Sequence, residues 1–155
     1  MNSLPRILLV EDSPKDAELT INALAEYNLA NDVLHLRDGA EALDFLYRRG
    51  DFAGRATGQP IVVLLDLKMP RVGGMEVLRQ MKGDPDLKLI PVVVMTSSRE
   101  DQDLLDSYEL GVNAYVVKPV KFQNFVEAVK QVGVFWAVFN QPPPASAERP
   151  GGTRA

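Results

Sequence analysis

Short, wholly apolar runs recur along the chain and constrain its fold more than any other feature. Ile7–Val10 and Ile61–Leu65 are the clearest, since each contains only Ile, Leu and Val. Such runs are typical of strands buried on both faces of a parallel sheet. The segments between them carry apolar residues at helical spacing. The expected strands cover residues 6–11, 33–37, 61–66, 91–96 and 114–117.

Helices are expected between and after these strands. Ser13-Pro14 provides an N-cap and a first-turn proline for the first helix, and Gly111 is suited to end the fourth. Strand and helix therefore alternate along the chain, which predicts a doubly wound, three-layer α/β fold. Five strands suit a parallel sheet in the flavodoxin-like order 2-1-3-4-5. The first, fourth and fifth expected helices cover about 14–28, 100–110 and 121–139, the second opens at Asp38-Gly39, and the third follows the Gly73-Gly74 turn and is ended by Gly83-Asp84-Pro85.

Length and composition indicate one globular domain over residues 1–140. The chain has 155 residues, of which 46% are hydrophobic and 25% charged, enough to bury an independent core. A net charge of −4 gives nucleic acid no electrostatic reason to bind. With no cysteine, no recognisable signal peptide and no membrane-length apolar run, we expect a cytoplasmic protein without a membrane partner. Residues 141–155 are rich in Pro and Gly and are expected to form a disordered tail.

Acidic residues directly follow two of the expected strands. Glu11 and Asp12 end the first strand, and Asp66 ends the third. Taken alone, Glu11 and Asp12 would be explained by the polarity of a strand end and by helix capping, and Asp66 by the start of a turn. The carboxyl ends of parallel strands meet at one edge of the sheet, so the three carboxylates should lie together and repel one another unless a cation joins them. The sequence therefore predicts a divalent-metal site with Asp66 as a candidate nucleophile.

Two further strand ends carry Thr96 and the pair Lys118-Pro119. With these residues, the chain resembles the receiver domain of two-component response regulators over residues 6–139. Each motif is weak alone, but the four in order, each ending an expected strand, form a specific pattern. The motifs are Val10-Glu11-Asp12, Leu65-Asp66-Leu67-Lys68-Met69-Pro70 with Gly74, Val94-Met95-Thr96-Ser97 and Val117-Lys118-Pro119.

The resemblance implies a phosphoacceptor protein rather than a dedicated enzyme. Asp66 would accept a phosphoryl group from a phosphohistidine of a sensor histidine kinase, with self-phosphorylation and slow self-dephosphorylation as its only reactions. Asp12 would hold Mg²⁺ directly and Glu11 through water, because Mg²⁺ keeps several waters. Asp66 and the backbone carbonyl of Lys68 would complete the protein ligands. Output would be protein–protein contact or phosphorelay.

The resemblance also implies a switch around the phosphoryl group. The Thr96 hydroxyl would donate to one phosphoryl oxygen, and the Lys118 ammonium would bind another. Tyr115 would then rotate inward behind Thr96, although plain packing on its strand would explain this residue as well. Pro119 would form a cis peptide bond that aims Lys118 inward.

Within this family, the chain is most similar to small single-domain regulators paired with phytochrome-type histidine kinases, so a bacteriophytochrome is the expected partner. In the family, the residues two after the phosphoacceptor and two after the switch threonine tune dephosphorylation, and here they are Lys68 and Ser98. A lysine lacks the carboxamide or carboxylate that would orient an attacking water, so slow self-hydrolysis is expected. The subgroup features are Lys82–Pro85, Tyr108–Tyr115, Phe135-Trp136, Asn140–Pro143 and the glycine-rich segment before Pro60.

Two other functions agree with parts of the pattern. An aspartyl-phosphate phosphohydrolase of the haloacid dehalogenase type would need a second Asp two positions after Asp66, where Lys68 stands. A flavin- or nucleotide-binding domain would need a glycine-rich phosphate loop after the first strand, where Glu11–Pro14 would repel phosphate. The phosphoacceptor interpretation is therefore favoured.

The last expected helix, residues 121–139, is apolar on more than one side. Its Val134, Phe135 and Val138 should project away from the core, and an exposed apolar patch usually marks an interface. This predicts a symmetric homodimer built around the strand at 114–117 and the last two expected helices, with those side chains near the two-fold axis. The alternative is that the proline-rich tail folds back over them. The expected core face consists of Phe122, Phe125, Val126, Val129, Val132 and Trp136.

Overall fold

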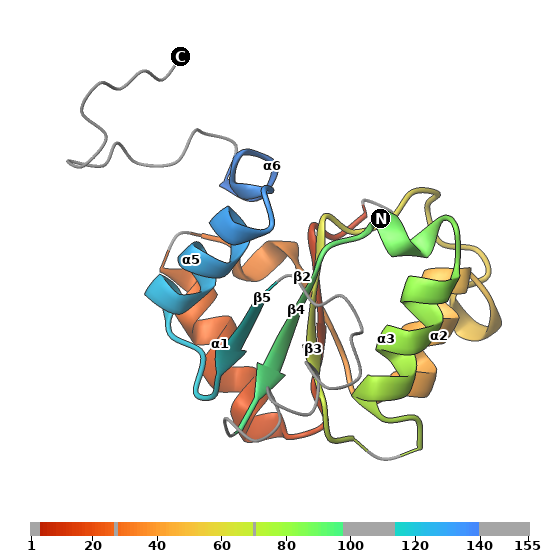
Figure 1. Ribbon diagram of the computed structural model, residues 1–155, viewed down its shortest axis with the longest axis horizontal. Coiled ribbons are helices and arrows are strands. Elements are labelled where there is room, and N and C mark those ends of the chain that lie inside the picture. Colours follow the sequence, from red (N-terminus) through yellow and green to blue (C-terminus); the bar gives the residue numbers. More distant parts are fainter. Residues whose placement is uncertain (1–3, 27, 70, 98–113, 140–155) are drawn as a thin grey trace.

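The computed structural model describes residues 4–26, 28–69, 71–97 and 114–139. Its sheet has five parallel strands in the order β2-β1-β3-β4-β5, with helices on both faces (Figure 1). This arrangement confirms the doubly wound, three-layer fold and the strand order expected from the sequence. The strands are β1 (Ile7–Val10), β2 (Val33–Leu36), β3 (Val62–Asp66), β4 (Val92–Thr96) and β5 (Ala114–Val117).

The helices differ from expectation mainly at their ends. The first ends at Ala25 rather than near Asn28, whose φ of 60° is left-handed. The helix expected over residues 100–110 lies outside the described residues. Within the described ranges, no helix is long and apolar enough to cross a membrane. The helices are α1 (Pro14–Ala25), α2 (Gly39–Tyr47), α3 (Gly74–Gly83), α5 (Phe122–Gln131) and α6 (Phe135–Phe139), with 3₁₀ turns η1 (Ala30–Asp32), η2 (Gly50–Phe52) and η3 (Leu87–Leu89).

Side chains of the strands alternate between two cores, one on each face of the sheet. Leu8 and Val10 belong to the core shared with α2 and α3, whereas Ile7 and Leu9 belong to the core shared with α1, α5 and α6. Figure 1 shows α2 and α3 on one side of the sheet and α1 and α5 on the other. Every residue of β1, β3 and β4 is buried, which explains why these strands are apolar except at the last residues of β3 and β4, Asp66 and Thr96. Polar groups are left for the strand ends.

Side-chain caps place the start of two helices at the carboxyl edge of the sheet. The Ser13 hydroxyl accepts a hydrogen bond from the backbone N–H of Asp16 at 3.1 Å and caps α1. Asp38 caps α2 in the same way by accepting the N–H of Glu41 at 2.9 Å. Both helices therefore begin beside the ends of β1 and β2, with the positive ends of their dipoles toward that edge.

The segment expected to form one helix over residues 121–139 forms two. α5 ends at Gln131, and Gly133, with a φ of 80°, turns the chain before α6 begins at Phe135. Glycine adopts this left-handed backbone without the steric cost of a Cβ atom. The helical periodicity therefore restarts after Gly133, and the later side chains face directions that a continuous helix would not give them.

This restart reverses the expected burial of residues 134–138. Phe135 is 6% exposed and Val138 0%, whereas Trp136, which was expected in the core, is 59% exposed. Val134 is partly buried against the same core, and the ring of Phe135 lies 4.5 Å from that of Phe139. The expectation that Val134, Phe135 and Val138 project away from the core is therefore wrong. These side chains stabilise the single chain instead of forming an exposed patch.

Candidate functional site

Three carboxylates meet where β1 and β3 end. The two strands pair with Val10 opposite Leu65, so the next residue of each, Glu11 and Asp66, emerges at the same point of the carboxyl edge. Asp12 follows directly. One carboxylate oxygen of each acid lies within 4.8 Å of the others. The structure therefore brings together the three acids from which the sequence predicted a metal site.

The three acids differ in their access to solvent. Glu11 is 0% exposed and Asp66 4%, whereas Asp12 is exposed. The backbone N–H of Glu11 donates to the carbonyl of Leu36 at 3.0 Å, and its Oε2 accepts the backbone N–H of Ser13 at 3.1 Å. Glu11 is thus held rigidly at the floor of the cluster, and Asp12 borders the solvent side from which a ligand would arrive.

The protonation of Asp66 reflects this crowding. Burial, and after it the negative charge of Glu11, raise the pKa of Asp66 to about 7 from the ordinary 3.8, while the positive charge of Lys118 partly opposes the rise. The ionised form of this carboxylate is therefore disfavoured near neutral pH unless more positive charge lies beside it. A hard divalent cation, which prefers carboxylate oxygens, would remove that cost. The donor set fits such a metal.

Lys118 reaches the same cluster from the end of β5. Its backbone N–H donates to the carbonyl of Thr96 at 2.8 Å, and its peptide bond to Pro119 is cis. The Nζ atom lies 3.0 Å from Glu11 Oε1 and 3.4 Å from Asp66 Oδ1. Burial would lower the pKa of Lys118, but the hydrogen bond that its ammonium donates to Glu11 and the negative charge of Asp66 outweigh burial and raise the pKa. Lys118 therefore carries its positive charge beside the candidate nucleophile.

Thr96 and Tyr115 occupy neighbouring strands beside this cluster. Thr96 is the last residue of β4, is 1% exposed, and pairs with Val117 of β5. Tyr115 pairs with Val94 and is 38% exposed, so its ring is in an outward position. Ser98, the second residue expected to tune dephosphorylation, lies outside the described residues.

The loop after β3 is packed tightly against the start of α3. The Gly74 N–H donates to the carbonyl of Leu67 at 3.0 Å, and a Cβ atom at Gly74 would collide with the carbonyl oxygen of Asp66. The backbone N–H of Lys68 donates to Asp66 Oδ1 at 3.4 Å, and its side chain is exposed. Close packing at Gly74 therefore fixes the backbone that carries both Asp66 and Lys68.

Sequence reasoning missed one member of the cluster, Asp16. Its Oδ2 lies 3.1 Å from Lys118 Nζ, across 102 positions of sequence. Asp16 is in the first turn of α1, three residues after Ser13, where an acid is ordinarily explained by helix capping. The usable signal was that α1 begins directly after Glu11 and Asp12, so its first turn has to lie against the same edge.

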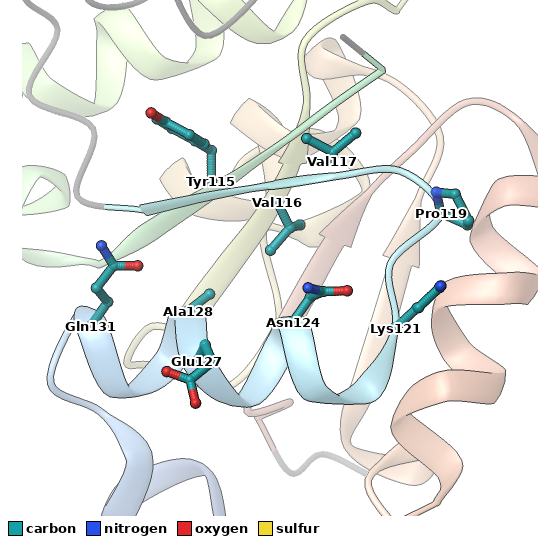
Figure 2. A pocket seen from close by; sticks show the side chains of 9 residues that line it. All are labelled: Tyr115, Val116, Val117, Pro119, Lys121, Asn124, Glu127, Ala128 and Gln131. Carbon is teal, nitrogen blue, oxygen red and sulfur yellow. The ribbon is translucent and has the colours of Figure 1, made fainter. Parts of the chain in front are cut away.

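A separate groove of about 450 Å³ lies between β5 and α5. Figure 2 shows Val116 pointing toward α5, while Tyr115 and Val117 point the opposite way. Lys121 and Glu127 line the groove from the helix side. Its lining includes none of the three clustered carboxylates, but it does include Tyr115 and Pro119.

Comparison with known proteins agrees with this geometry. The model of the response regulator receiver domain matches residues 7–130. The chain is 40% identical over 130 residues to the response regulator Rcp1 of Synechocystis sp., covering 84% of this chain and 87% of Rcp1.

Two solved bacteriophytochrome response regulators are also similar. RtBRR is 56% identical with a TM-score of 0.82, covering 94% of this chain and 88% of that chain. AtBRR is 57% identical with a TM-score of 0.83, covering 90% of this chain and 99% of that chain. Together with the clustered acids and Lys118, these matches place the chain in the receiver-domain family of response regulators, as a signalling domain rather than a dedicated enzyme.

Proposed function

We propose that this protein is a cytoplasmic response regulator of a phytochrome-type pathway, in which Asp66 accepts a phosphoryl group from a phosphohistidine of a sensor histidine kinase. The observation that carries the proposal is the position of Asp66. It is buried between two further acids and a lysine whose Nζ lies 3.4 Å from its Oδ1. This arrangement combines a nucleophile, ligands for a cation and a fixed positive charge.

Each residue has a defined part in the transfer. An oxygen of ionised Asp66 forms the new O–P bond while the P–N bond to the kinase histidine breaks, and that nitrogen keeps the electron pair. Glu11, Asp12, Asp66 and the backbone carbonyl of Lys68 would hold Mg²⁺, which supplies positive charge for the phosphoryl oxygens. Lys118 adds a point charge for one of these oxygens.

The response to phosphorylation involves Thr96 and Tyr115. Thr96, buried at the end of β4, donates its hydroxyl to a phosphoryl oxygen, and Tyr115 leaves its outward position on β5 to pack behind it. The 38% exposure of Tyr115 supports this assignment, because an outward ring has room to move. Lys68 lacks a carboxamide or carboxylate that would orient water toward the phosphorus, which leaves self-dephosphorylation slow, and Ser98 is the second position that tunes it.

The similar proteins support the choice of cation and kinase. Rcp1 has a structure described as the Mn²⁺-bound form, at 37% identity and a TM-score of 0.67. RcpA, also 37% identical with a TM-score of 0.69, is described as a phosphorylated cyanobacterial phytochrome response regulator. RtBRR and AtBRR are bacteriophytochrome response regulators. A bacteriophytochrome kinase is therefore the proposed donor, and Mg²⁺ the proposed physiological cation.

A homodimer is also proposed, which keeps the expected contact at β5 but not the contacts expected of Val134, Phe135 and Val138. Tyr115 and Val117 on the edge strand β5 are 38% and 44% exposed, and Trp136 on α6 is 59% exposed. These exposed apolar side chains support an interface between two copies, whereas Phe135 and Val138 are used inside each copy.

Phosphotransfer with a labelled kinase tests the function directly. The wild type, mixed with Mg²⁺ and either a phosphorylated bacteriophytochrome or acetyl phosphate, should gain one phosphoryl group on Asp66, located by mass spectrometry. Asp66→Asn keeps the shape of the side chain but removes the nucleophile, and Asp12→Ala removes a metal ligand, so both should stay unmodified while folding normally. Modification at another residue, or continuous release of phosphate at enzymatic rates, would contradict the proposal.

A further inference from the structure

Asp16 belongs to the charged cluster without belonging to the metal ligands. Its Oδ2 is 3.1 Å from Lys118 Nζ, yet the three acids that could share a cation are Glu11, Asp12 and Asp66. Asp16 is therefore the one partner of Lys118 in this cluster that neither the metal nor the phosphoryl group is expected to engage.

The helix cap does not require the Asp16 carboxylate. In a capping box, the acid in the first turn would reach back to the backbone N–H of the cap residue. Here Ser13 is that residue, and its N–H donates to Glu11 Oε2 at 3.1 Å instead. The half of the cap that involves Asp16 uses its backbone N–H, which donates to Ser13 Oγ at 3.1 Å. Its carboxylate is turned toward Lys118.

The contacts of Lys118 are arranged so that Asp16 competes with the phosphoacceptor. An ammonium has three donors, and the Nζ atom lies 3.0 Å from Glu11, 3.1 Å from Asp16 and 3.4 Å from Asp66. The contact with Asp66 is the longest of the three. A phosphoryl group on Asp66 would add negative charge there and attract the ammonium more strongly. Lys118 would then move away from Asp16.

Resting on the function proposed above, we propose that Asp16 is a positioning residue that restrains Lys118 before phosphorylation and releases it to the phosphoryl group. Two effects of its charge follow. It neutralises part of the charge of Lys118, which otherwise repels a metal at the neighbouring carboxylates. It also opposes an anion on Asp66, both by repulsion and by holding Lys118 back.

Removing this charge should therefore change two affinities in opposite directions. Asp16→Asn should weaken Mg²⁺ binding and, at saturating Mg²⁺, strengthen the binding of beryllofluoride, a stable mimic of the phosphoryl group. Because Asp16 is 36% exposed at its side chain, we expect about a three- to fivefold change in each affinity, the range of a partly solvated ion pair. A loss of packing or folding would instead weaken the binding of both Mg²⁺ and beryllofluoride.

The experiment is a pair of NMR titrations, first with Mg²⁺ and then with beryllofluoride at saturating Mg²⁺. Asp16→Glu keeps the charge and should stay close to the wild type. Glu18→Gln removes the same charge from an exposed position on the same helix and should change neither affinity by as much. In a Lys118→Ala background, Asp16→Asn should lose most of its effect on beryllofluoride, because no ammonium remains to be released.

The outcomes separate this inference from the proposed function. If the wild type fails to bind beryllofluoride at Asp66, the proposed function is wrong. If the wild type binds it and Asp16→Asn changes neither affinity, or weakens both, the role of Asp16 is overturned while the proposed function stands. Opposite shifts that are absent in Asp16→Glu and Glu18→Gln support the inference.

Discussion

At the scale of single residues, the site is a balance of charges around one buried carboxylate. Asp66 has a raised pKa because burial and Glu11 disfavour its ionised form, yet phosphoryl transfer needs that ionised form. Lys118 compensates only in part, because its Nζ is also shared with Glu11 and Asp16. A divalent cation would complete the compensation, which ties activity, metal binding and pH together.

The first prediction at this scale concerns pH. The pKa of Asp66 is about 7 in the folded protein and about 3.9 in an unfolded chain. A raised acid pKa stabilises the fold below the unfolded value, and that contribution is lost as the pH rises from about 4 to about 7. Urea unfolding without metal should therefore show the wild type losing stability relative to Asp66→Asn across this window. Mg²⁺ should restore the unfolding free energy of the wild type most strongly above about pH 7 and have little effect on that of Asp66→Asn. Parallel profiles of unfolding free energy against pH for the two proteins would refute the raised pKa.

The second concerns Lys118. Lys118→Ala keeps the three metal-binding carboxylates and should still bind Mg²⁺, but it removes the charge that links the phosphoryl group to β5. The changes in the chemical shifts of Thr96 and Tyr115 on adding beryllofluoride should be large in the wild type and mostly absent in the variant. Lys118→Arg serves as the control that keeps the charge. Chemical-shift changes of wild-type size in Lys118→Ala would mean that Lys118 neutralises the carboxylates but does not link the phosphoryl group to β5.

At the scale of elements, the start of α3 holds the phosphoacceptor loop in place. Gly74 lets the helix approach so closely that a Cβ atom there would collide with the backbone of Asp66 and Leu67. Both contacts are with backbone rather than with a flexible side-chain end, so relief requires the loop itself to move. The geometry of the metal ligands on that loop therefore depends on a residue with no side chain.

Gly74→Ala should therefore damage both stability and the site. We expect a loss of about 1–3 kcal/mol in unfolding free energy, the usual cost of overpacking, together with weaker Mg²⁺ binding. Gly83→Ala, at the other end of α3, meets no atom within 4 Å and should be neutral or stabilising by up to about 1 kcal/mol. Thermal unfolding and a Mg²⁺ titration of the two variants make the comparison. Equal stability and equal Mg²⁺ affinity would mean that the loop after β3 moves aside at little energetic cost.

At the scale of the whole molecule, the break at Gly133 decides which residues stabilise the chain and which remain available to partners. Phe135 packs beside Phe139, and Val138 is fully buried. Trp136, which lies between Phe135 and Val138 in the sequence, is exposed. Arg6 Nη1 donates to the carbonyl of Val138 at 2.9 Å and ties α6 to the N-terminal end of the chain. The C-terminal part of the domain is thus integral to its core.

A pair of charge substitutions tests this division. Phe135→Asp buries a carboxylate in the core and should reduce the unfolding free energy by at least about 3 kcal/mol. Trp136→Asp, one residue further along the chain, should change the unfolding free energy of the monomer by no more than about 0.5 kcal/mol, measured at a protein concentration that dissociates any dimer. Urea denaturation at one pH measures both changes in unfolding free energy. A stable Phe135→Asp variant would mean that Phe135 is exposed, as first expected from the sequence.

Assembly is tested separately at β5. Sedimentation should find the wild type dimeric, and Val117→Glu should dissociate it, because Val117 is 44% exposed on the edge strand. The variant should retain the stability of the single chain and its acceptance of the phosphoryl group. A wild type that stays monomeric at high concentration, with or without beryllofluoride, would exclude the proposed homodimer.

The sequence by itself determined the strand order and the meeting of Glu11, Asp12 and Asp66. Wholly apolar runs have to be buried on both faces, and parallel strands then deliver their last residues to one edge. The pairing of Asp16 with Lys118 depended on tertiary structure, because an acid in a first helical turn has a sufficient local explanation. The faces of residues 134–138 also depended on it, since a single left-handed glycine resets helical periodicity. Likewise, the raised pKa of Asp66 follows from burial and neighbouring charge, which arise only when segments distant in sequence pack together.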